Sequence, residues 1–313
     1  MANLTLKHLR YFDALALHGH FGRAAEAASI TQPALSVQIR DMETELGVTL
    51  FERGPRQVRL TQVGEDVAPR VRDILRALDE LGDIARASRD CLAGRLRIGV
   101  IPTIAPYLLP SIISRLSQSH PALEIHVRET LTSRLIQELS DGRLDAAIVA
   151  LPVSEPSLTE VPLFSETFVL VRPEVDESVP VPDRETLREM RLLLLEEGHC
   201  FRDQALSFCN VRSALPREML DGSSLSTLVQ MVGAGIGVTL IPEMAVPVET
   251  RATPVSVSRF LGAQPTRTVG MIWRNTSPLK EQLHQISETV RACGEDLAEA
   301  RRAAETGPRK PPV

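Results

Sequence analysis

Residues 22–40 read Gly22-Arg-Ala-Ala-Glu-Ala-Ala-Ser-Ile-Thr-Gln-Pro-Ala-Leu-Ser-Val-Gln-Ile-Arg40 and predict two short helices joined by a turn. The four alanines of the first half allow one helix to press closely against its neighbour. Thr31 is a suitable N-cap for the second helix, and Pro33 occupies a first-turn position where its missing N–H costs nothing. Leu35 and Ile39 lie one turn apart and are expected to face a core. This order is typical of a helix-turn-helix.

The segments around this motif extend it into a compact module. Apolar residues from Leu6 to Ala16 recur at spacings of three and four, which predicts a preceding helix. The string Arg53-Gly-Pro-Arg-Gln-Val-Arg59 places three cations around a turn, in the manner of a wing lying along DNA phosphates. The alternative is an alanine-rich helical hairpin followed by a solvated basic loop, but the order and spacing of the signals favour DNA binding. The residues predicted to contact DNA are Thr31, Gln32, Pro33, Ser36, Gln38, Arg40, Arg53, Arg56 and Arg59.

The charge distribution is compatible with this prediction. The 313-residue chain has a net charge of −5, which argues against a protein that coats nucleic acid without selectivity. Residues 1–60, however, hold seven Lys and Arg against six Asp and Glu. The acidity therefore lies outside the helix-turn-helix module.

Residues 64–89 predict one long helix with a narrow apolar seam. Its apolar side chains alternate spacings of four and three over almost three heptads, and charged residues flank them. The alternative is an amphipathic helix lying on its own domain, but the narrow seam favours pairing with a second copy. The predicted dimer contacts are Val67, Val71, Ile74, Leu78 and Leu81.

The rest of the chain predicts an α/β fold. After Gly94, strand and helix patterns alternate up to residue 150, as in a parallel sheet covered by helices. A proline-rich stretch at residues 173–182 separates a second set of elements, which ends with a helix at residues 278–291.

Taken together, these segments resemble the LysR-type transcriptional regulators. The resemblance rests on residues 6–12, 22–40, 46–53 and 60–64, and its domain order extends over the whole chain. It implies dimers, and commonly tetramers, on double-stranded promoter DNA, and we expect RNA polymerase as a further partner.

The resemblance also implies a domain plan. The regulatory domain is expected to be two-lobed and similar to type II periplasmic binding proteins. The expected parts are a winged helix-turn-helix at 1–60, a linker and dimerisation helix at 61–93, a regulatory domain at 94–294 and a tail at 295–313 that is partly helical and then flexible. Lobe I is expected at about 94–163 and 268–294, and lobe II at about 164–267.

One segment contains two cysteines, Cys200 and Cys209, nine residues apart. It reads Glu196-Glu-Gly-His-Cys-Phe-Arg-Asp-Gln-Ala-Leu-Ser-Phe-Cys209. Cys200 lies at the start of a helix predicted over 201–208, where the helix dipole favours an anion, and His199 and Arg202 are expected to add positive charge. Such surroundings favour the thiolate, the species that attacks a peroxide. Cys209 lies in an apolar context, and considered without Cys200 it would be interpreted as an inert core cysteine.

The spacing of the two cysteines suggests a switch. On an ideal helix nine residues rise about 13.5 Å and place the side chains on opposite faces, whereas a disulfide needs Cα atoms within roughly 7 Å. If the helix exists in the reduced state, these thiols can join only when it unwinds. Oxidation of Cys200 to a sulfenic acid, followed by capture by Cys209, would then lock in a different local fold.

The same segment resembles the peroxide-sensing branch of the LysR family. Residues 101–110, 198–204 and 208–209 carry this resemblance, as do 224–228, 237–242 and 267–270. It implies that Cys200 is the peroxidatic cysteine and Cys209 the resolving one. The implied peroxide-pocket residues are Thr103, Thr132, His199 and Arg267.

The resemblance gives two of these residues specific roles. Thr103 would help to hold the peroxide, and Arg267 would steady the reactive thiol. Without the resemblance, Thr103 could equally cap a turn and Arg267 could pair with a surface carboxylate. Cys91 and Cys293 lie outside the motif and are expected to have no role.

Other functions fit parts of the sequence. A LysR-type regulator that answers a metabolite between its lobes, with both cysteines structural, and a thiol peroxidase anchored to DNA remain as alternatives. We favour a regulator over an enzyme because no reductant site is apparent. A transport binding protein is disfavoured by the winged module and by the lack of a leader.

The sequence carries no signal for a membrane, cofactor or metal. It has no apolar run long enough to cross a membrane, so a cytoplasmic location is expected. No cofactor is expected, and the histidines near the N-terminus are not paired with cysteines at metal-ligand spacing.

Overall fold

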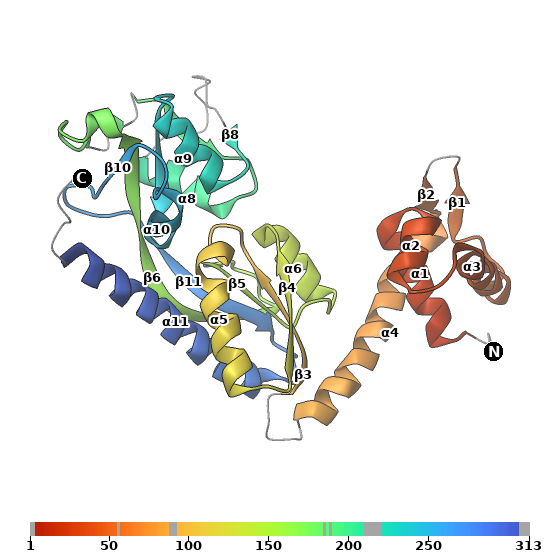
Figure 1. Cartoon of the computed structure of the whole chain (residues 1–313). Coiled ribbons are helices and arrows are strands. Elements are labelled where there is room, and N and C mark those ends of the chain that lie inside the picture. Colours follow the sequence, from red (N-terminus) through yellow and green to blue (C-terminus); the bar gives the residue numbers. More distant parts are fainter. Residues whose placement is uncertain are drawn as a thin grey trace. The chain divides into compact units, whose positions relative to one another are not determined.

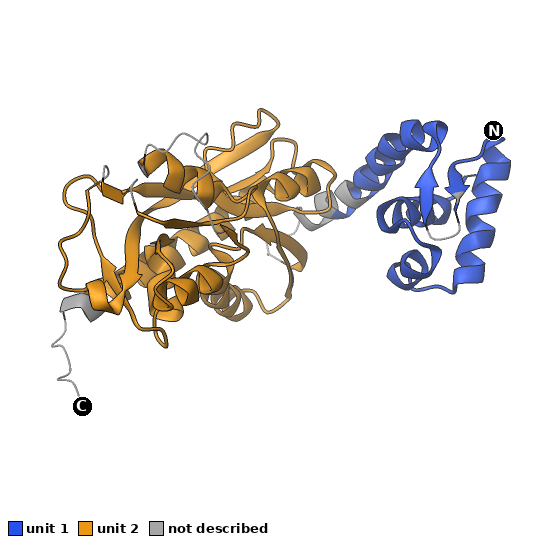
Figure 2. Cartoon of the chain, turned by 90° about the horizontal axis from the view of Figure 1, so that it is seen from above, with its two compact units in different colours: residues 1–88 blue, residues 89–313 orange. Residues whose placement is uncertain are grey.

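The computed structural model describes residues 4–54, 57–87, 93–183, 186–187, 190–209 and 221–306. The chain divides into two compact units, residues 1–88 and residues 89–313 (Figure 2). No helix in these ranges is long and apolar enough to cross a membrane.

Unit 1 contains three helices, a two-stranded sheet and a long helix, as labelled in Figure 1. The three helices are α1 (Leu6–His18), α2 (Phe21–Ala27) and α3 (Gln32–Leu46). They are followed by the antiparallel strands β1 (Phe51–Arg53) and β2 (Val58–Leu60), and then by α4 (Gln62–Ala87). The predicted helix-turn-helix with its wing is confirmed.

Local signals set the limits of α3. The Thr31 hydroxyl accepts from the Ala34 N–H at 3.4 Å, so the predicted N-cap is present, and Pro33 lies in the first turn. At the other end Gly47 has a φ of +68°, a left-handed conformation that glycine adopts without steric cost. The helix therefore begins and ends at residues that favour those positions.

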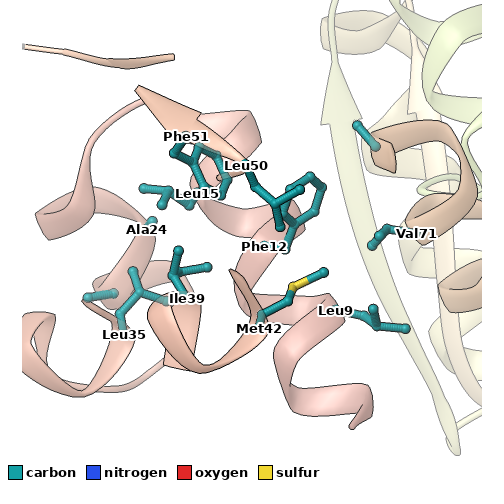
Figure 3. Packing of buried hydrophobic residues seen from close by; sticks show 12 residues of the cluster. Leu9, Phe12, Leu15, Ala24, Leu35, Ile39, Met42, Leu50, Phe51 and Val71 are labelled. Atoms are coloured by element: carbon teal, nitrogen blue, oxygen red, sulfur yellow. The ribbon is translucent and has the colours of Figure 1, made fainter. Parts of the chain in front are cut away.

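The core of unit 1 joins all of its elements. Leu35 and Ile39 are fully buried, as predicted, and Phe12 packs with Phe51, whose ring centroid lies 5.2 Å away (Figure 3). Val71 of α4 also belongs to this cluster. The core thus fixes the recognition helix α3 against the wing and the first turns of α4.

The start of α4 corrects part of the predicted dimer seam. Val71 is only 3% exposed and Val67 packs against the same cluster, so both stabilise their own unit. Ile74 and Leu81 remain exposed, at 49% and 64%, and Leu78 is partly buried. The alternative of a helix lying on its own domain therefore holds for the first part of α4, because the same apolar period serves both purposes.

The first half of unit 2 is a parallel βαβαβ arrangement. Strand β3 (Gly94–Val100) lies between β4 (Leu123–Glu129) and β5 (Ala146–Leu151) and is parallel to both. The connecting helices are α5 (Ala105–Ser119) and α6 (Thr132–Ser140). The predicted alternation of strands and helices is present.

Two long antiparallel strands carry the sheet into its second half. Strand β6 (Leu158–Pro173) pairs with β11 (Thr266–Arg274) along its first part (Figure 1). Its last residues pair with β9 (Val238–Pro242) and β10 (Val255–Ser258). With β7 (Leu192–Leu195) and β8 (Asp221–Gly222), the main path of strands across the described ranges is β4-β3-β5-β11-β6-β9-β7-β8. A two-lobed α/β domain results, as predicted.

The second half contains the two-cysteine segment. Its strands are β7 (Leu192–Leu195), β8 (Asp221–Gly222), β9 (Val238–Pro242) and β10 (Val255–Ser258). Its helices are α8 (Cys200–Cys209), α9 (Leu225–Gly233) and α10 (Val246–Glu249), with short 3-10 turns at Glu174–Asp176 and Glu243–Ala245.

The C-terminal helix extends far into the predicted tail. Helix α11 spans Lys280–Thr306, so the helical part of the tail is continuous with the helix that was expected to end near residue 291. Gly294 allows this course, because a Cβ at that position would lie 2.2 Å from the ring of Phe164. Beyond it, Asp296 pairs with Arg115 of α5 and Arg301 pairs with Glu243.

Candidate functional site

Cys200 lies where a strand leads into a helix. Strand β7 ends at Leu195, and α8 begins at Cys200, at the position predicted for the reactive thiol. Gly198 has a φ of +95°, a conformation that side chains rarely adopt, and it turns the chain between the two elements. The Cys200 thiol is free and partly exposed.

A small pocket opens beside this thiol. Cys200, Thr103, Thr132 and His199 line it, so the structure brings together three of the four predicted pocket residues with the predicted thiol. The rest of the lining is Ile101, Pro102, Leu131, Gly198 and Phe201. Its volume is about 10 Å³, close to the space that one water-sized molecule needs. The pocket suits a molecule of very few atoms and is too small for an ordinary metabolite.

One hydroxyl in this pocket lacks a partner. Thr132 is the first residue of α6, and its Oγ1 is buried without a hydrogen-bond partner among the residues that the structure describes. A buried hydroxyl without a partner costs roughly 1–3 kcal/mol. A small polar ligand in the pocket would remove that cost.

Arg267 supports the pocket from outside its wall. The side chain is buried, and its Nη1 donates to Thr103 Oγ1 at 2.8 Å while Nη2 donates to the Thr103 carbonyl at 3.0 Å. Its partner carboxylate is Glu166, at 2.7 Å, which is itself buried. The pairing with a surface carboxylate is therefore wrong, and the contact of Arg267 with the pocket runs through Thr103.

Glu166 was not predicted from the sequence. Burial raises the pKa of its carboxyl, and this outweighs the lowering by Arg267 and the Met244 N–H. Glu166 and Arg267 lie directly opposite each other in the β6–β11 register. Only the pairing of two strands about 100 residues apart identifies this contact.

Neither of the two neighbours predicted to add positive charge near Cys200, His199 and Arg202, does so in the structure. Burial lowers the pKa of His199, and Glu196 only partly opposes this, so the imidazole is mainly neutral at pH 7. Arg202 is buried, and its Nη1 donates to Asp221 at 2.6 Å and to the Leu195 carbonyl at 2.7 Å. Its charge is therefore compensated by Asp221.

The two cysteines of the motif lie at opposite ends of α8. The helix is one residue longer at each end than predicted, and its ten residues separate the two Cα atoms by about 13.5 Å. This separation exceeds the roughly 7 Å that a disulfide allows. The side chain of Cys209 and all of Cys91 lie outside the described residues, whereas Cys293 is buried in α11.

The predicted DNA contacts gather around α3 and the wing. The structure exposes Thr31, Gln32, Pro33, Arg40 and Arg59, and it leaves Ser36 and Gln38 partly exposed. Ser36 also accepts from Arg40 Nε through its carbonyl at 3.4 Å. Arg56 and the side chain of Arg53 lie outside the described residues.

Comparison with known families accounts for both units. Residues 6–65 match the bacterial regulatory helix-turn-helix protein model of the lysR family, and residues 89–293 match the LysR substrate binding domain. The chain belongs to the LysR family. Members of this family bind DNA through the helix-turn-helix and regulate transcription, which confirms the predicted family and its class of function.

Within the LysR family, the chain is similar to OxyR proteins. It is 41% identical to the DNA-binding transcriptional dual regulator OxyR of Escherichia coli over 294 residues, which cover 92% of this chain and 95% of that protein. It is also 41% identical to a probable hydrogen peroxide-inducible genes activator of Streptomyces viridosporus over 300 residues, covering 94% and 95% of the two chains.

Solved OxyR structures have the same fold. A full-length OxyR variant from Pseudomonas aeruginosa matches with a TM-score of 0.72 and 38% identity, covering 93% of this chain and 99% of that one. A hydrogen-peroxide-bound OxyR mutant from Corynebacterium glutamicum matches with a TM-score of 0.67 and 32% identity, covering 99% and 98%.

Proposed function

We propose that this LysR-family regulator senses hydrogen peroxide through Cys200. The observation that carries the proposal is the pocket of about 10 Å³ that joins a free thiol to the unpartnered hydroxyl of Thr132. Relatives named as hydrogen peroxide-inducible genes activators support the same ligand. A metabolite would need a different site, because this pocket is too small for one.

The first chemical step oxidises Cys200. Its thiolate attacks one peroxide oxygen, an S–O bond forms and the O–O bond breaks, so that sulfur loses two electrons and the peroxide gains them. The departing hydroxide takes a proton and leaves as water. Thr103 already accepts from Arg267, which leaves its O–H free to donate toward a peroxide in the pocket.

The second step joins the two cysteines. The thiol of Cys209 attacks the sulfenic sulfur of Cys200, the S–S bond forms and water leaves. Because α8 holds the two Cα atoms about 13.5 Å apart, the helix must unwind before the bond can close. Oxidation would thereby change the packing of the second half of unit 2.

We further propose that this local change alters the arrangement of subunits on promoter DNA. The exposed side chains Ile74 and Leu81 of α4, with Leu78, offer an apolar surface to a second copy. Two such dimers would form a tetramer with four DNA-binding modules, and RNA polymerase would respond to their arrangement on the promoter.

Brief exposure of the reduced full-length protein to peroxide is expected to yield a peptide pair linked through Cys200 and Cys209. Reduced protein should give both cysteines as free thiols, because α8 keeps them apart. Mass spectrometry of a proteolytic digest measures the linkage, and circular dichroism measures the loss of helix. Cys200 that remains a free thiol after exposure would rule out the mechanism.

Replacing Gln32 with Ala is expected to weaken promoter binding about 5- to 150-fold, because one good base contact contributes about 1–3 kcal/mol. Gln32 is exposed at the N-terminal end of α3, where recognition helices meet base edges. Fluorescence anisotropy with promoter DNA measures the effect. The matched control is Gln285→Ala, the same change at an exposed position of α11, which should bind as tightly as the unaltered protein. Equal affinities for all three proteins would place DNA recognition elsewhere.

A further inference from the structure

Glu166 lies at the centre of the sheet, in the strand that joins its two halves. Its side chain is buried, and it stands opposite Arg267 in the antiparallel pairing of β6 with β11. Oε1 accepts from the Met244 N–H at 3.1 Å, and Oε2 accepts from the Arg267 guanidinium at 2.7 Å. Both oxygens are therefore held by groups of fixed position.

Arg267 depends on this carboxylate for its own position. Its guanidinium is buried and lies 5.8 Å from the ring centroid of Phe168 and 5.9 Å from that of Phe201. These rings fill space beside it, and Glu166 supplies the neutralising charge within contact distance. A buried cation without such a carboxylate reorients or draws in water.

Thr103 is the third residue in this series of contacts, after Glu166 and Arg267. Arg267 donates to both its hydroxyl and its carbonyl, so one guanidinium fixes the side chain and the main chain of the same residue. Thr103 lines the pocket beside Cys200, whereas Glu166 and Arg267 do not. A continuous series of contacts thus joins a carboxylate outside the pocket to a hydroxyl inside it.

We propose that Glu166 is a positioning residue for peroxide reduction, acting through Arg267 on the orientation of the Thr103 hydroxyl. The inference rests on the proposed function, since it concerns the same pocket and the same thiol. Glu166 itself touches neither thiol nor ligand. Its effect is on the geometry in which the hydroxyl meets a bound peroxide and not on the existence of the thiolate.

The test compares two reagents on the full-length protein. Glu166→Gln should lower the rate of Cys200 oxidation by hydrogen peroxide about tenfold or more, since a misplacement of about 1 Å can cost about 100-fold. Alkylation of Cys200 by iodoacetamide, which needs the thiolate but not the Thr103 hydroxyl, should change less than about twofold. The matched control is Glu243→Gln. That glutamate borders the same small cavity as Glu166 but pairs with Arg259 and Arg301, and its loss should leave both rates unchanged.

A double-mutant cycle separates positioning from general damage. If Glu166 acts through Thr103, then adding Glu166→Gln to Thr103→Val should lower the peroxide rate no further than Thr103→Val alone. Effects that multiply, an unchanged peroxide rate in Glu166→Gln, or an equal loss with both reagents would each overturn the inference. Unaltered protein that fails to react with peroxide would instead remove the proposed function, and that outcome is visible before any variant is made.

Poor folding of Glu166→Gln would not block the test. Glu166→Gln combined with Arg267→Gln removes both charges of the buried pair, which proteins tolerate better than the loss of one partner. This pair of changes also frees Thr103, so the peroxide rate should fall while iodoacetamide alkylation is retained. Retention of the full peroxide rate in the double variant would contradict the inference as clearly as in the single one.

Discussion

Replacing Cys200 with Ser is expected to abolish the response to peroxide and to leave promoter binding intact. A serine hydroxyl stays protonated near neutral pH and does not attack peroxide, so oxidation should fall to the uncatalysed background. Unit 1, which carries the predicted DNA contacts, has its own core and should fold as before. Promoter-driven transcription in vitro with and without peroxide measures the response, and anisotropy measures DNA affinity.

Two further variants make this result specific. Cys293→Ser, a change in a buried residue of α11 far along the chain from the motif, should keep the full response. Cys209→Ser should still consume one equivalent of peroxide but stop at the sulfenic acid of Cys200, which a dimedone adduct detects. A normal transcriptional response in Cys200→Ser would show that another group senses the signal.

Replacing Phe12 with Ala is expected to unfold unit 1 in a large fraction of molecules and thereby to abolish DNA binding. Phe12 is fully buried and packs against Phe51, and removing such a ring costs about 3–5 kcal/mol. The whole stability of a domain is only about 5–15 kcal/mol. Unit 2 does not contain this residue, so Cys200 should still react with peroxide at the unaltered rate.

Urea unfolding followed by circular dichroism and anisotropy measures the two effects of Phe12→Ala separately. The matched control is Leu17→Ala, an apolar truncation in the same helix at a side chain that is 58% exposed. It should keep both stability and DNA affinity. Loss of peroxide reactivity in Phe12→Ala would mean that the two units do not fold independently.

Much of unit 1 was predictable because its signals are local. Thr31 and Pro33 mark the start of α3, and alternating apolar residues mark its buried face. The helix predicted over 201–208 is also present, as α8, with one more residue at each end. Such signals act within a few residues and need no knowledge of the rest of the chain.

Other predictions failed because the same sequence pattern is compatible with two different sets of contacts in the folded protein. The apolar period of α4 fits its own core as well as a second helix, and only the packing shows that Val71 belongs to the former. The helix expected to end at residue 291 continues through Gly294, where the ring of Phe164 leaves no room for a Cβ. Arg202 lies near Cys200 in sequence, yet its charge is taken by Asp221.

The family motifs and the nine-residue spacing of Cys200 and Cys209 were enough to predict a LysR-type regulator with a two-cysteine segment. Only the tertiary structure decided which side chains surround the Cys200 thiol. Glu166, Arg267 and Thr103 come from three separate parts of the chain and meet because β6 and β11 pair in one register. Hydrogen bonds and ion pairs act over a few ångströms of space, whatever the separation in sequence, so folding alone brings these three groups together.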